Sequence, residues 1–283
     1  MQHRSRADVC DKRARITATL LTLQGQEEQM ITSTGNQQMK NIALLQKKAK
    51  ARNEQETFIV EGRKMFGEVP REWLKKVYVT EQAAEETDLS GVDYEVVADA
   101  VFKSISDTQT PQGILSLVRM PHYELSDLLA GENTNLLVLE SIQDPGNLGT
   151  MLRTGEGAGI TGVVMNRNTV DLFNPKTIRS TMGSIYRVPF YVSENLPETV
   201  QTLREAGVTL FAAHLRGKAS YDKMNYKKAC GFLIGNEGNG LSDELADLAD
   251  AYVRIPMEGK VESLNAAIAA SLLVYEVHRQ RQD

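Results

Sequence analysis

The chain has 283 residues, of which 41% are hydrophobic and 24% charged, as in an ordinary folded protein. This length suits one large domain or two smaller ones. No apolar run approaches the roughly 20 residues of a membrane-spanning helix. Only two cysteines occur, Cys10 and Cys230, so a disulfide framework and a cysteine-rich metal site are excluded. We expect a cytoplasmic protein without a membrane span or a bound metal.

Charge is distributed unevenly along the chain. Residues 1–53 carry ten Lys or Arg and four Asp or Glu, a net of +6, so the remainder carries −11 to reach the overall −5. A basic start on an acidic body is typical of a protein whose one end meets nucleic acid. From charge alone, a helix face that is merely solvated and has no partner explains this distribution equally well.

Residues 1–38 show weak periodicity and a polar tract, and we expect a mobile extension there or a translation start placed too early. From Asn41 the pattern predicts a short amphipathic helix with Ile42, Leu45 and Ala49 on one face. Strand-like and helical patterns then alternate, which predicts a small α/β domain over residues 39–120. Its expected strands are Thr57–Glu61, Lys76–Thr80, Tyr94–Val97 and Gly113–Val118.

Residues 121–133 interrupt this alternation and are expected to form a linker with at most a turn or two of helix. The near-continuous apolar strands that follow are typical of a mostly parallel sheet buried on both faces, so residues 134–283 should form a second α/β domain. Its expected strands are Leu136–Leu139, Gly162–Met165, Val188–Val192, Thr209–Ala213 and Gly231–Ile234. A final helix is expected from Ser263 to Arg281, with an apolar stripe of Leu264, Ile268, Leu272 and Tyr275.

Residues 157–162 (GAGITG) match the glycine fingerprint of dinucleotide-binding proteins. That fingerprint works where it follows a strand and opens a helix, so that the helix N-terminus meets the pyrophosphate. Here it follows a helical segment and precedes a strand, where glycine supplies a left-handed helix end. We therefore reject a dinucleotide-dependent oxidoreductase.

Three polar stretches carry most of the functional signal: residues 147–153 (NLGTMLR), 235–240 (GNEGNG) and 255–265 (IPMEGKVESLN). The second and third stretches directly follow strand-like runs, and the ends of strands are where α/β proteins place ligand sites. Three glycines in six residues permit positive φ and close backbone approach to a ligand, which favours a site at 235–240 over a flexible loop. Backbone groups at the start of the final helix, with Ser263 as the expected cap, suit an adenine edge and a carboxylate.

The first stretch also admits a structural interpretation, which is favoured when it is taken alone. Asn147 or its neighbour would cap a helix, and Glu156 would pair with Arg153 on the surface of that helix. His214 and Cys230 are likewise interpreted as structural residues, Cys230 being a buried apolar one.

In their residues and in their order along the chain, the three stretches resemble the motifs of the SpoU family of RNA ribose 2′-O-methyltransferases, which belong to the knotted SPOUT class. The resemblance covers about residues 135–281. It implies an α/β fold with a mostly parallel sheet and a C-terminal trefoil knot, although general folding rules make knots very rare. Residues 41–120 more loosely resemble the small RNA-binding substrate domain of the same family.

The resemblance implies S-adenosylmethionine as cofactor, RNA as partner, and a homodimer whose interface includes the final helix. In the family, the arginine that matches Arg153 is proposed to act on the ribose 2′-hydroxyl. An arginine is an unusual base because its pKa exceeds about 12. Arg153 would therefore either have a strongly depressed pKa or orient the ribose hydroxyl while another group takes the proton. The expected catalytic residues are Arg153, Asn147, Glu237, Ser263 and Asn265. The expected cofactor-binding residues are Ala213, Gly235, Asn236, Gly238, Ile255, Met257, Leu264 and Asn265. The expected RNA-binding residues are Lys47, Lys48, Lys50, Arg52 and Arg179.

These observations predict an enzyme that methylates a ribose 2′-hydroxyl, with ribosomal RNA favoured over transfer RNA because of the separate N-terminal domain. An antibiotic-resistance enzyme acting on ribosomal RNA stays open as an alternative. A catalytically silent RNA-binding protein is disfavoured, because such a protein would lose motif residues that this chain keeps.

Overall fold

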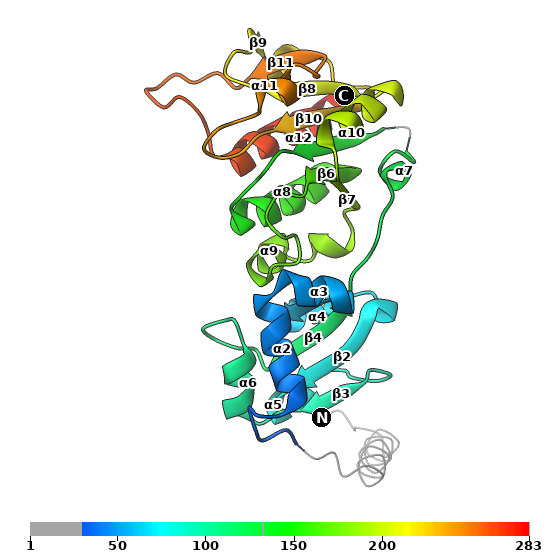
Figure 1. Cartoon of the computed structure of the whole chain (residues 1–283), viewed down its shortest axis with the longest axis vertical. Coiled ribbons are helices and arrows are strands. Elements are labelled where there is room, and N and C mark those ends of the chain that lie inside the picture. Colours follow the sequence, from blue (N-terminus) through cyan, green and yellow to red (C-terminus); the bar gives the residue numbers. More distant parts are fainter. Residues whose placement is uncertain (1–29, 132, 283) are drawn as a thin grey trace, which may run out of the picture.

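A computed structural model describes residues 30–131 and 133–282, which form an elongated molecule with two β-sheets (Figure 1). The smaller sheet lies at one end and is built from residues before the segment 121–133. The larger sheet lies at the other end and is built from residues after it. Figure 1 shows residues 121–131 running between the two sheets, with one short helix, α7 (Leu125–Leu128).

The smaller sheet has the strand order β1-β4-β2-β3, and all four expected strands are confirmed. The pairs β1–β4 and β2–β4 are antiparallel, whereas β2–β3 is parallel. The strands are β1 (Thr57–Glu61), β2 (Leu74–Val79), β3 (Tyr94–Val96) and β4 (Ile114–Arg119). The helices are α2 (Gln37–Lys47), α3 (Ala49–Gln55), α4 (Arg63–Glu68), α5 (Glu81–Glu86) and α6 (Asp99–Ile105), with a 3-10 turn, η1 (Arg71–Trp73).

The beginning of the described chain is more ordered than expected. Ile31 is buried, its N–H donates to Val96 O at 2.9 Å, and its C=O accepts from Ala98 N at 3.0 Å. Residues 30–38 therefore belong to the smaller domain, with Ile31 covering the edge of β3. The rest of the expected extension, residues 1–29, lies outside the described residues.

The amphipathic helix expected from Asn41 is two helices. Lys48 has an extended conformation (φ −123°, ψ 110°), which ends α2 and begins α3. Met39, Ile42 and Leu45 are buried on α2, but Ala49 is exposed at the start of α3. The expectation that Ala49 continues the apolar face is wrong, because the break at Lys48 changes the direction of the chain.

The larger sheet has the strand order β7-β6-β5-β10-β8-β11-β9, and each neighbouring pair is parallel. The expected parallel sheet is confirmed, and the five expected strands are present. The strands are β5 (Asn135–Leu139), β6 (Gly162–Asn166), β7 (Phe190–Ser193), β8 (Thr209–Ala213), β9 (Ala219–Ser220), β10 (Cys230–Ile234) and β11 (Ala251–Arg254). The strand β9 was not expected. It has only two residues, which is too short for a sequence pattern, and it pairs with β11 at the edge of the sheet.

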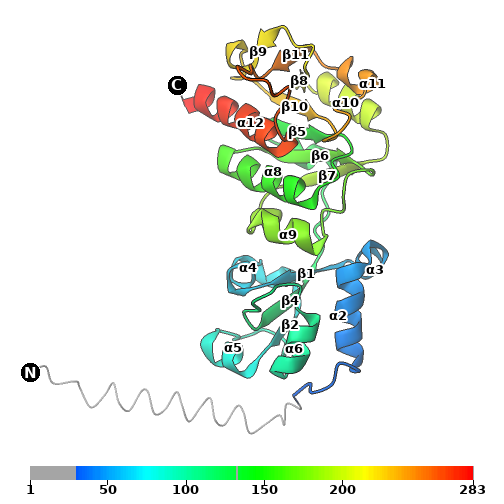
Figure 2. The ribbon, with the colours of Figure 1, turned by 90° about the vertical axis from the view of Figure 1, so that its left-hand side faces the viewer.

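Helices cover both faces of this sheet, as its apolar strands require. Figure 2 shows α8 and α12 on one face and α10 and α11 on the other. All five residues of both β5 and β10 are buried between these layers. The helices are α8 (Pro145–Ala158), α9 (Pro175–Thr181), α10 (Leu196–Glu205), α11 (Asp243–Ala246) and α12 (Ala266–Gln282), with 3-10 turns η2 (Ser184–Tyr186) and η3 (Tyr221–Lys223).

The two sheets share one hydrophobic cluster. Phe58 of β1 packs on Phe173, with ring centroids 4.9 Å apart, and Phe173 packs on Phe190 of β7. The buried side chain of Ile178 on α9 joins the same cluster. Apolar burial is therefore continuous from β1 to the larger sheet, and this burial stabilises the contact between the two domains.

The glycine segment 157–162 ends α8 and precedes β6, as expected. Gly159 adopts the left-handed conformation (φ 77°) directly after Ala158, the last residue of α8. A left-handed helix end is the role that glycine fills at this position. The segment opens no helix, which confirms that it is not a dinucleotide fingerprint.

Candidate active site

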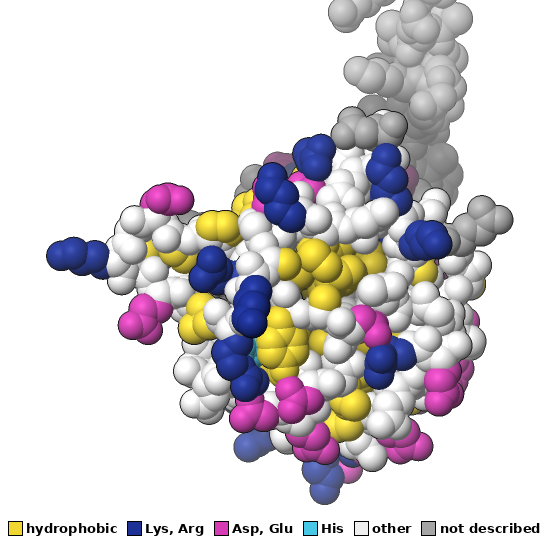
Figure 3. All heavy atoms as spheres, turned by 90° about the horizontal axis from the view of Figure 1, so that it is seen from above, with side chains coloured by type: hydrophobic (Ala, Val, Ile, Leu, Met, Phe, Trp, Pro, Cys, Tyr) yellow, Lys and Arg dark blue, Asp and Glu magenta, His cyan; other side chains and the backbone are white. Residues whose placement is uncertain are grey.

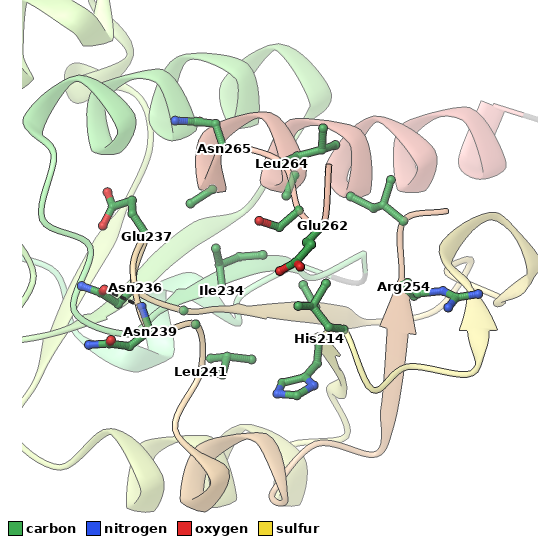
Figure 4. Close-up of a pocket in the computed structure, with 18 of the residues that line it drawn as sticks. His214, Ile234, Asn236, Glu237, Asn239, Leu241, Arg254, Glu262, Leu264 and Asn265 are labelled. Carbon is green, nitrogen blue, oxygen red and sulfur yellow. Dashed lines mark hydrogen bonds between the residues drawn. The ribbon is translucent and has the colours of Figure 1, made fainter. Parts of the chain in front are cut away.

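A cavity of about 530 Å³ lies at the carboxyl ends of β8, β10 and β11 (Figure 4). Its walls come from the loop that follows each of these strands and from the first turns of α12. Carboxyl ends of parallel strands are where α/β proteins bind ligands. Two of the three polar stretches, residues 235–240 and 255–265, therefore meet at one site, as the sequence predicts.

Gly235 lets the first of these loops fold back on itself. A Cβ atom at this position would lie 2.1 Å from Gly240 C and 2.1 Å from Leu241 N. Asn236 fixes the turn: its Oδ1 accepts from Gly238 N at 2.8 Å, and its Nδ2 donates to Ser141 O at 2.8 Å. The loop is thus a built structure rather than a flexible connection.

The third stretch, residues 147–153, reaches the cavity through its first residue. Asn147 Nδ2 donates to Glu237 Oε1 at 2.9 Å, and Asn147 Oδ1 accepts from Asn265 Nδ2 at 3.0 Å. These three side chains come from α8, the loop after β10 and the residue before α12. Together they form a hydrogen-bonded chain that joins the three sequence motifs at the edge of the cavity.

Glu237 is fixed at one end of this chain. Its carboxylate also accepts from Gln143 N at 3.0 Å and from Asp144 N at 3.1 Å. Partial burial raises the pKa of Glu237, but the hydrogen bonds from Asn147, Gln143 and Asp144 outweigh that effect, so the pKa is lowered. Glu237 is therefore an ionised acceptor at neutral pH and is poorly suited to take a proton from a substrate.

Asn265, at the other end of this hydrogen-bonded chain, is the cap of α12. Its Oδ1 accepts from Ala267 N at 2.9 Å and from Ile268 N at 3.3 Å. The expectation that Ser263 caps this helix is wrong, because the helix begins three residues later, at Ala266. Ser263 instead lies in the preceding loop, where it lines the cavity.

The start of α8 differs from the expectation in a similar way. Asp144 is the cap, since its Oδ1 accepts from Asn147 N at 2.9 Å, and Asn147 lies in the first turn. Asp144 also pairs with Lys176 at 3.2 Å. Because Asp144 takes the capping role, the side-chain amide of Asn147 is available to join Glu237 to Asn265.

Two of the expected catalytic residues, Asn147 and Arg153, do not line this cavity. Asn147 is hydrogen-bonded to Glu237 and Asn265, which do line it, whereas Arg153 is farther along α8. It lies six residues after Asn147 on α8, or about 9 Å along the helix axis, and its side chain is exposed. The expected pair with Glu156 is absent: Glu156 binds Arg187 and accepts from Ser184 Oγ at 2.6 Å. Within residues 30–131 and 133–282, Arg153 has no ion-pair partner.

All eight expected cofactor-binding residues line the cavity. Sequence reasoning missed four polar residues that also line it: Asn239, Arg254, Glu262 and His214. Asn239 and Glu262 lie inside the second and third stretches, and Arg254 directly precedes the third, so their positions are a signal that could have identified them. His214 was interpreted as structural although it directly follows β8, and the position at a strand end was its only signal.

The expected RNA-binding residues differ in their surroundings. Lys47, Lys48 and Lys50 are exposed on α2 and α3. Arg52 is 3% exposed; its guanidinium pairs with Asp171 and donates to the C=O groups of Leu45 and Gln46. The expectation that Arg52 contacts RNA is wrong, because these groups occupy its donors inside the protein.

Arg179 of α9 is partly exposed and pairs with Asp107 of the smaller domain.

Other cations lie far from α2. Figure 3 views the end of the molecule that carries β9 and β11, where Lys and Arg side chains stand beside apolar ones. Basic surface is therefore not confined to the first helices.

Among the described residues there is no group of three or more His, Cys, Asp or Glu side chains that could hold a metal ion. Over the same residues, no helix is long and apolar enough to cross a membrane. Cys230 is a free, buried thiol, as expected, and burial raises its pKa to about 11.

A wholly parallel sheet with a cofactor-sized cavity at the carboxyl ends of its strands defines an α/β enzyme that binds a small cofactor. Residues 134–275 match the model of the SpoU rRNA Methylase family, and residues 36–116 match that of the MRM3-like substrate binding domain. The chain therefore belongs to the SpoU rRNA methylase family, and the expectation of a methyltransferase is confirmed.

Similar proteins cover nearly the whole chain. A protein of Bacillus subtilis (strain 168) named 23S rRNA (guanosine(2553)-2′-O)-methyltransferase RlmP is 34% identical over 250 residues, which are 87% of this chain and 98% of that protein. The structure of an AdoMet-bound rRNA methyltransferase from Sinorhizobium meliloti is 34% identical with a TM-score of 0.80, covering 89% of this chain and 97% of that one. The SpoU methyltransferase AviRb from Streptomyces viridochromogenes, in complex with AdoMet, is 26% identical with a TM-score of 0.78, covering 88% and 99%.

Proposed function

We propose that this protein transfers a methyl group from S-adenosylmethionine to a ribose 2′-oxygen of ribosomal RNA. The observation that carries the proposal is the hydrogen-bonded chain Glu237–Asn147–Asn265 at the edge of the cavity, which unites the three motifs. The similar proteins, which are named as rRNA methyltransferases and one of which binds AdoMet, support both the donor and the ribosomal substrate.

The cavity fits S-adenosylmethionine in size and in chemistry. Its volume lies within the range of about 300–1,000 Å³ that is usual for small-molecule sites. Apolar side chains such as Ile234, Leu241 and Leu264 suit an adenine ring, and the carboxylates of Glu237 and Glu262 suit a cationic ligand. The backbone groups of residues 256–264 make no hydrogen bond with other backbone groups of the described chain, so they are free to bind the edges of a ligand.

When bound, S-adenosylmethionine supplies a methyl group that is already electrophilic. The protein must therefore hold the ribose hydroxyl in line and help to remove its proton. Glu237, Asn147 and Asn265 are prearranged by their mutual hydrogen bonds, and we infer that they position the substrate rather than exchange protons. Ser263 is exposed on the cavity wall and completes the proposed contacts to the reacting groups.

We infer that the active unit is a homodimer to which one chain contributes Arg153 and the other the cavity. The expected apolar stripe on α12 does not face the chain's own sheet: Ile268 is 52% and Tyr275 47% exposed. Leu272 is exposed beside them. Arg153 lies on α8, which packs along α12 through the hydrogen bond from Ser271 to Thr154. A second copy seated on the stripe would cover the apolar side chains and bring Arg153 towards a cavity.

The RNA would contact the exposed lysines 47, 48 and 50 and the partly exposed Arg179 through its phosphates. We take the smaller domain, extended to residues 30–120, as the RNA-binding domain, residues 121–133 as the linker and residues 134–283 as the catalytic domain. A trefoil knot in the catalytic domain is inferred from family membership. A cytoplasmic location is proposed by analogy with the similar proteins, which come from bacteria and are named as rRNA methyltransferases.

The experiment that tests the proposal is a map of ribose methylation in RNA from cells with and without the gene. We expect one ribosomal RNA nucleotide to lose its 2′-O-methyl group when the gene is deleted. Loss of a methyl group from transfer RNA instead, or no change in either RNA, would contradict the proposed substrate.

A further inference from the structure

His214 lies on the wall of the cavity but belongs to none of the three motifs. It directly follows β8, and its backbone N–H donates to Val253 O of β11 at 3.0 Å. The side chain is half-buried and lines the cavity, and Figure 4 shows it across the cavity from Asn265. A polar ring in this place is either part of the wall or a contact for what the cavity binds.

The position of the His214 ring is fixed from two directions. Its Nδ1 atom accepts a hydrogen bond from Arg216 N at 3.0 Å, and its ring centroid lies 5.3 Å from that of Tyr252. Tyr252 is itself held, because its hydroxyl donates to Asp247 and the Arg216 guanidinium lies 5.6 Å from its ring centroid. Rotating the imidazole would break the Nδ1 bond and the ring contact together.

The hydrogen bond to Nδ1 decides which nitrogen carries the proton. Burial and the nearby Arg216 charge lower the pKa of His214, although Asp243 and Asp247 oppose this, so the ring is neutral at pH 7. A neutral imidazole with an accepting Nδ1 has its proton on Nε2. Within the described chain no acceptor is bonded to Nε2, so the ring holds a fixed N–H donor without a partner on the cavity wall.

We propose that His214 binds the cofactor by donating the Nε2 proton to an acceptor on the nucleoside part of S-adenosylmethionine. This inference rests on the proposed function. Of the groups in that cofactor, the sulfonium and the ammonium accept no hydrogen bond, whereas the adenine nitrogens, the ribose oxygens and the carboxylate do. The methyl group belongs near Glu237 and Asn265, on the far side of the cavity, which leaves the nucleoside for the His214 side.

The test is calorimetric titration of the full-length protein and of His214→Phe and His214→Gln. Phenylalanine keeps the ring that packs on Tyr252 but has no donor, so affinity for S-adenosylmethionine should fall about three- to tenfold, as expected for one neutral hydrogen bond. Glutamine places an amide N–H near the position of Nε2 and should keep the affinity within about twofold. His122→Phe is the matched control, because His122 is an exposed histidine paired with Glu56 outside the cavity.

Two further ligands locate the contact. The demethylated product S-adenosylhomocysteine and 5′-methylthioadenosine, which lacks the amino-acid part, should lose affinity for His214→Phe by the same factor as S-adenosylmethionine. Equal affinities of the wild-type and His214→Phe proteins, with equal thermal unfolding midpoints, would overturn the inference. So would a loss that is absent with 5′-methylthioadenosine, because the contact would then be to the carboxylate. Failure of the wild-type protein to bind S-adenosylmethionine would instead refute the proposed function.

Discussion

Replacing Asn147 with aspartate tests the hydrogen-bonded chain at the cavity with almost no change in shape. The amide nitrogen that now donates to Glu237 Oε1 at 2.9 Å becomes an oxygen, so two carboxylates face each other. At that distance the repulsion is about 1.4 kcal/mol in bulk water and about 6 kcal/mol at an effective dielectric constant of 20. Glu237 is exposed, so the lower part of this range applies.

The lost hydrogen bond adds about 1 kcal/mol, which gives a total of about 2–4 kcal/mol. If the transition state needs the intact hydrogen-bonded chain Glu237–Asn147–Asn265, methyl transfer should fall about 30- to 1,000-fold. Affinity for S-adenosylmethionine should change little, because the cavity walls are unaltered. The assay is single-turnover methyl transfer to RNA, with calorimetry for the cofactor.

The pH dependence of Asn147→Asp gives an independent check. Like charges raise the pKa of one carboxyl of the pair. Below that raised pKa the pair shares a proton and a hydrogen bond forms again, so activity relative to wild type should rise as the pH falls. Asn195→Asp is the matched control, since Asn195 caps α10 away from the cavity. Full activity of Asn147→Asp at pH 8 would refute this account of the site.

Four other substitutions have defined outcomes. Arg52→Met should lower the free energy of unfolding in urea by about 3 kcal/mol, because it leaves Asp171 without its buried partner; a change below about 1 kcal/mol would contradict that role. Arg153→Ala should reduce methyl transfer at least about 100-fold while leaving cofactor affinity within about twofold, whereas near-normal turnover would make Arg153 a surface residue. Ile268→Asp combined with Leu272→Asp should give a mass near 31.4 kDa by light scattering, and a dimeric mass would show that α12 is not the interface. Replacing lysines 47, 48 and 50 together with glutamine should flatten the salt dependence of RNA affinity, and an unchanged slope would assign them to solvent.

Local patterns in the sequence were sufficient to predict the strands of both sheets, apart from the two-residue strand β9. The strands β5 and β10 are buried along their whole length, and such strands read as continuous apolar runs whatever their neighbours are. The glycine-rich stretch 235–240 was equally informative, because a Cβ atom at Gly235 has no room beside Gly240. These two kinds of signal located the cavity at the ends of the strands, whereas the individual cofactor-binding residues followed from the resemblance to the SpoU family.

Features that depend on distant parts of the chain could not be predicted. Arg52 looks like one of several surface cations, but Asp171, 119 residues later, makes it a buried residue. Helix periodicity identified the apolar stripe of α12, yet only the packing of the whole domain decides that Ile268 faces outwards. The cap of α12 is Asn265 rather than Ser263, because the path of the preceding loop sets where the helix begins.

The most direct test of the central claim is transfer of a labelled methyl group from S-adenosylmethionine to RNA by the purified protein. Ribosomal RNA from a strain that lacks the gene, and transfer RNA from the same strain, serve as substrates, and digestion to nucleosides locates the label. We expect about one methyl group per ribosomal RNA molecule, carried on a ribose 2′-oxygen and absent from the bases. Label on a base, or no transfer by a protein that binds the cofactor and the RNA, would contradict the account.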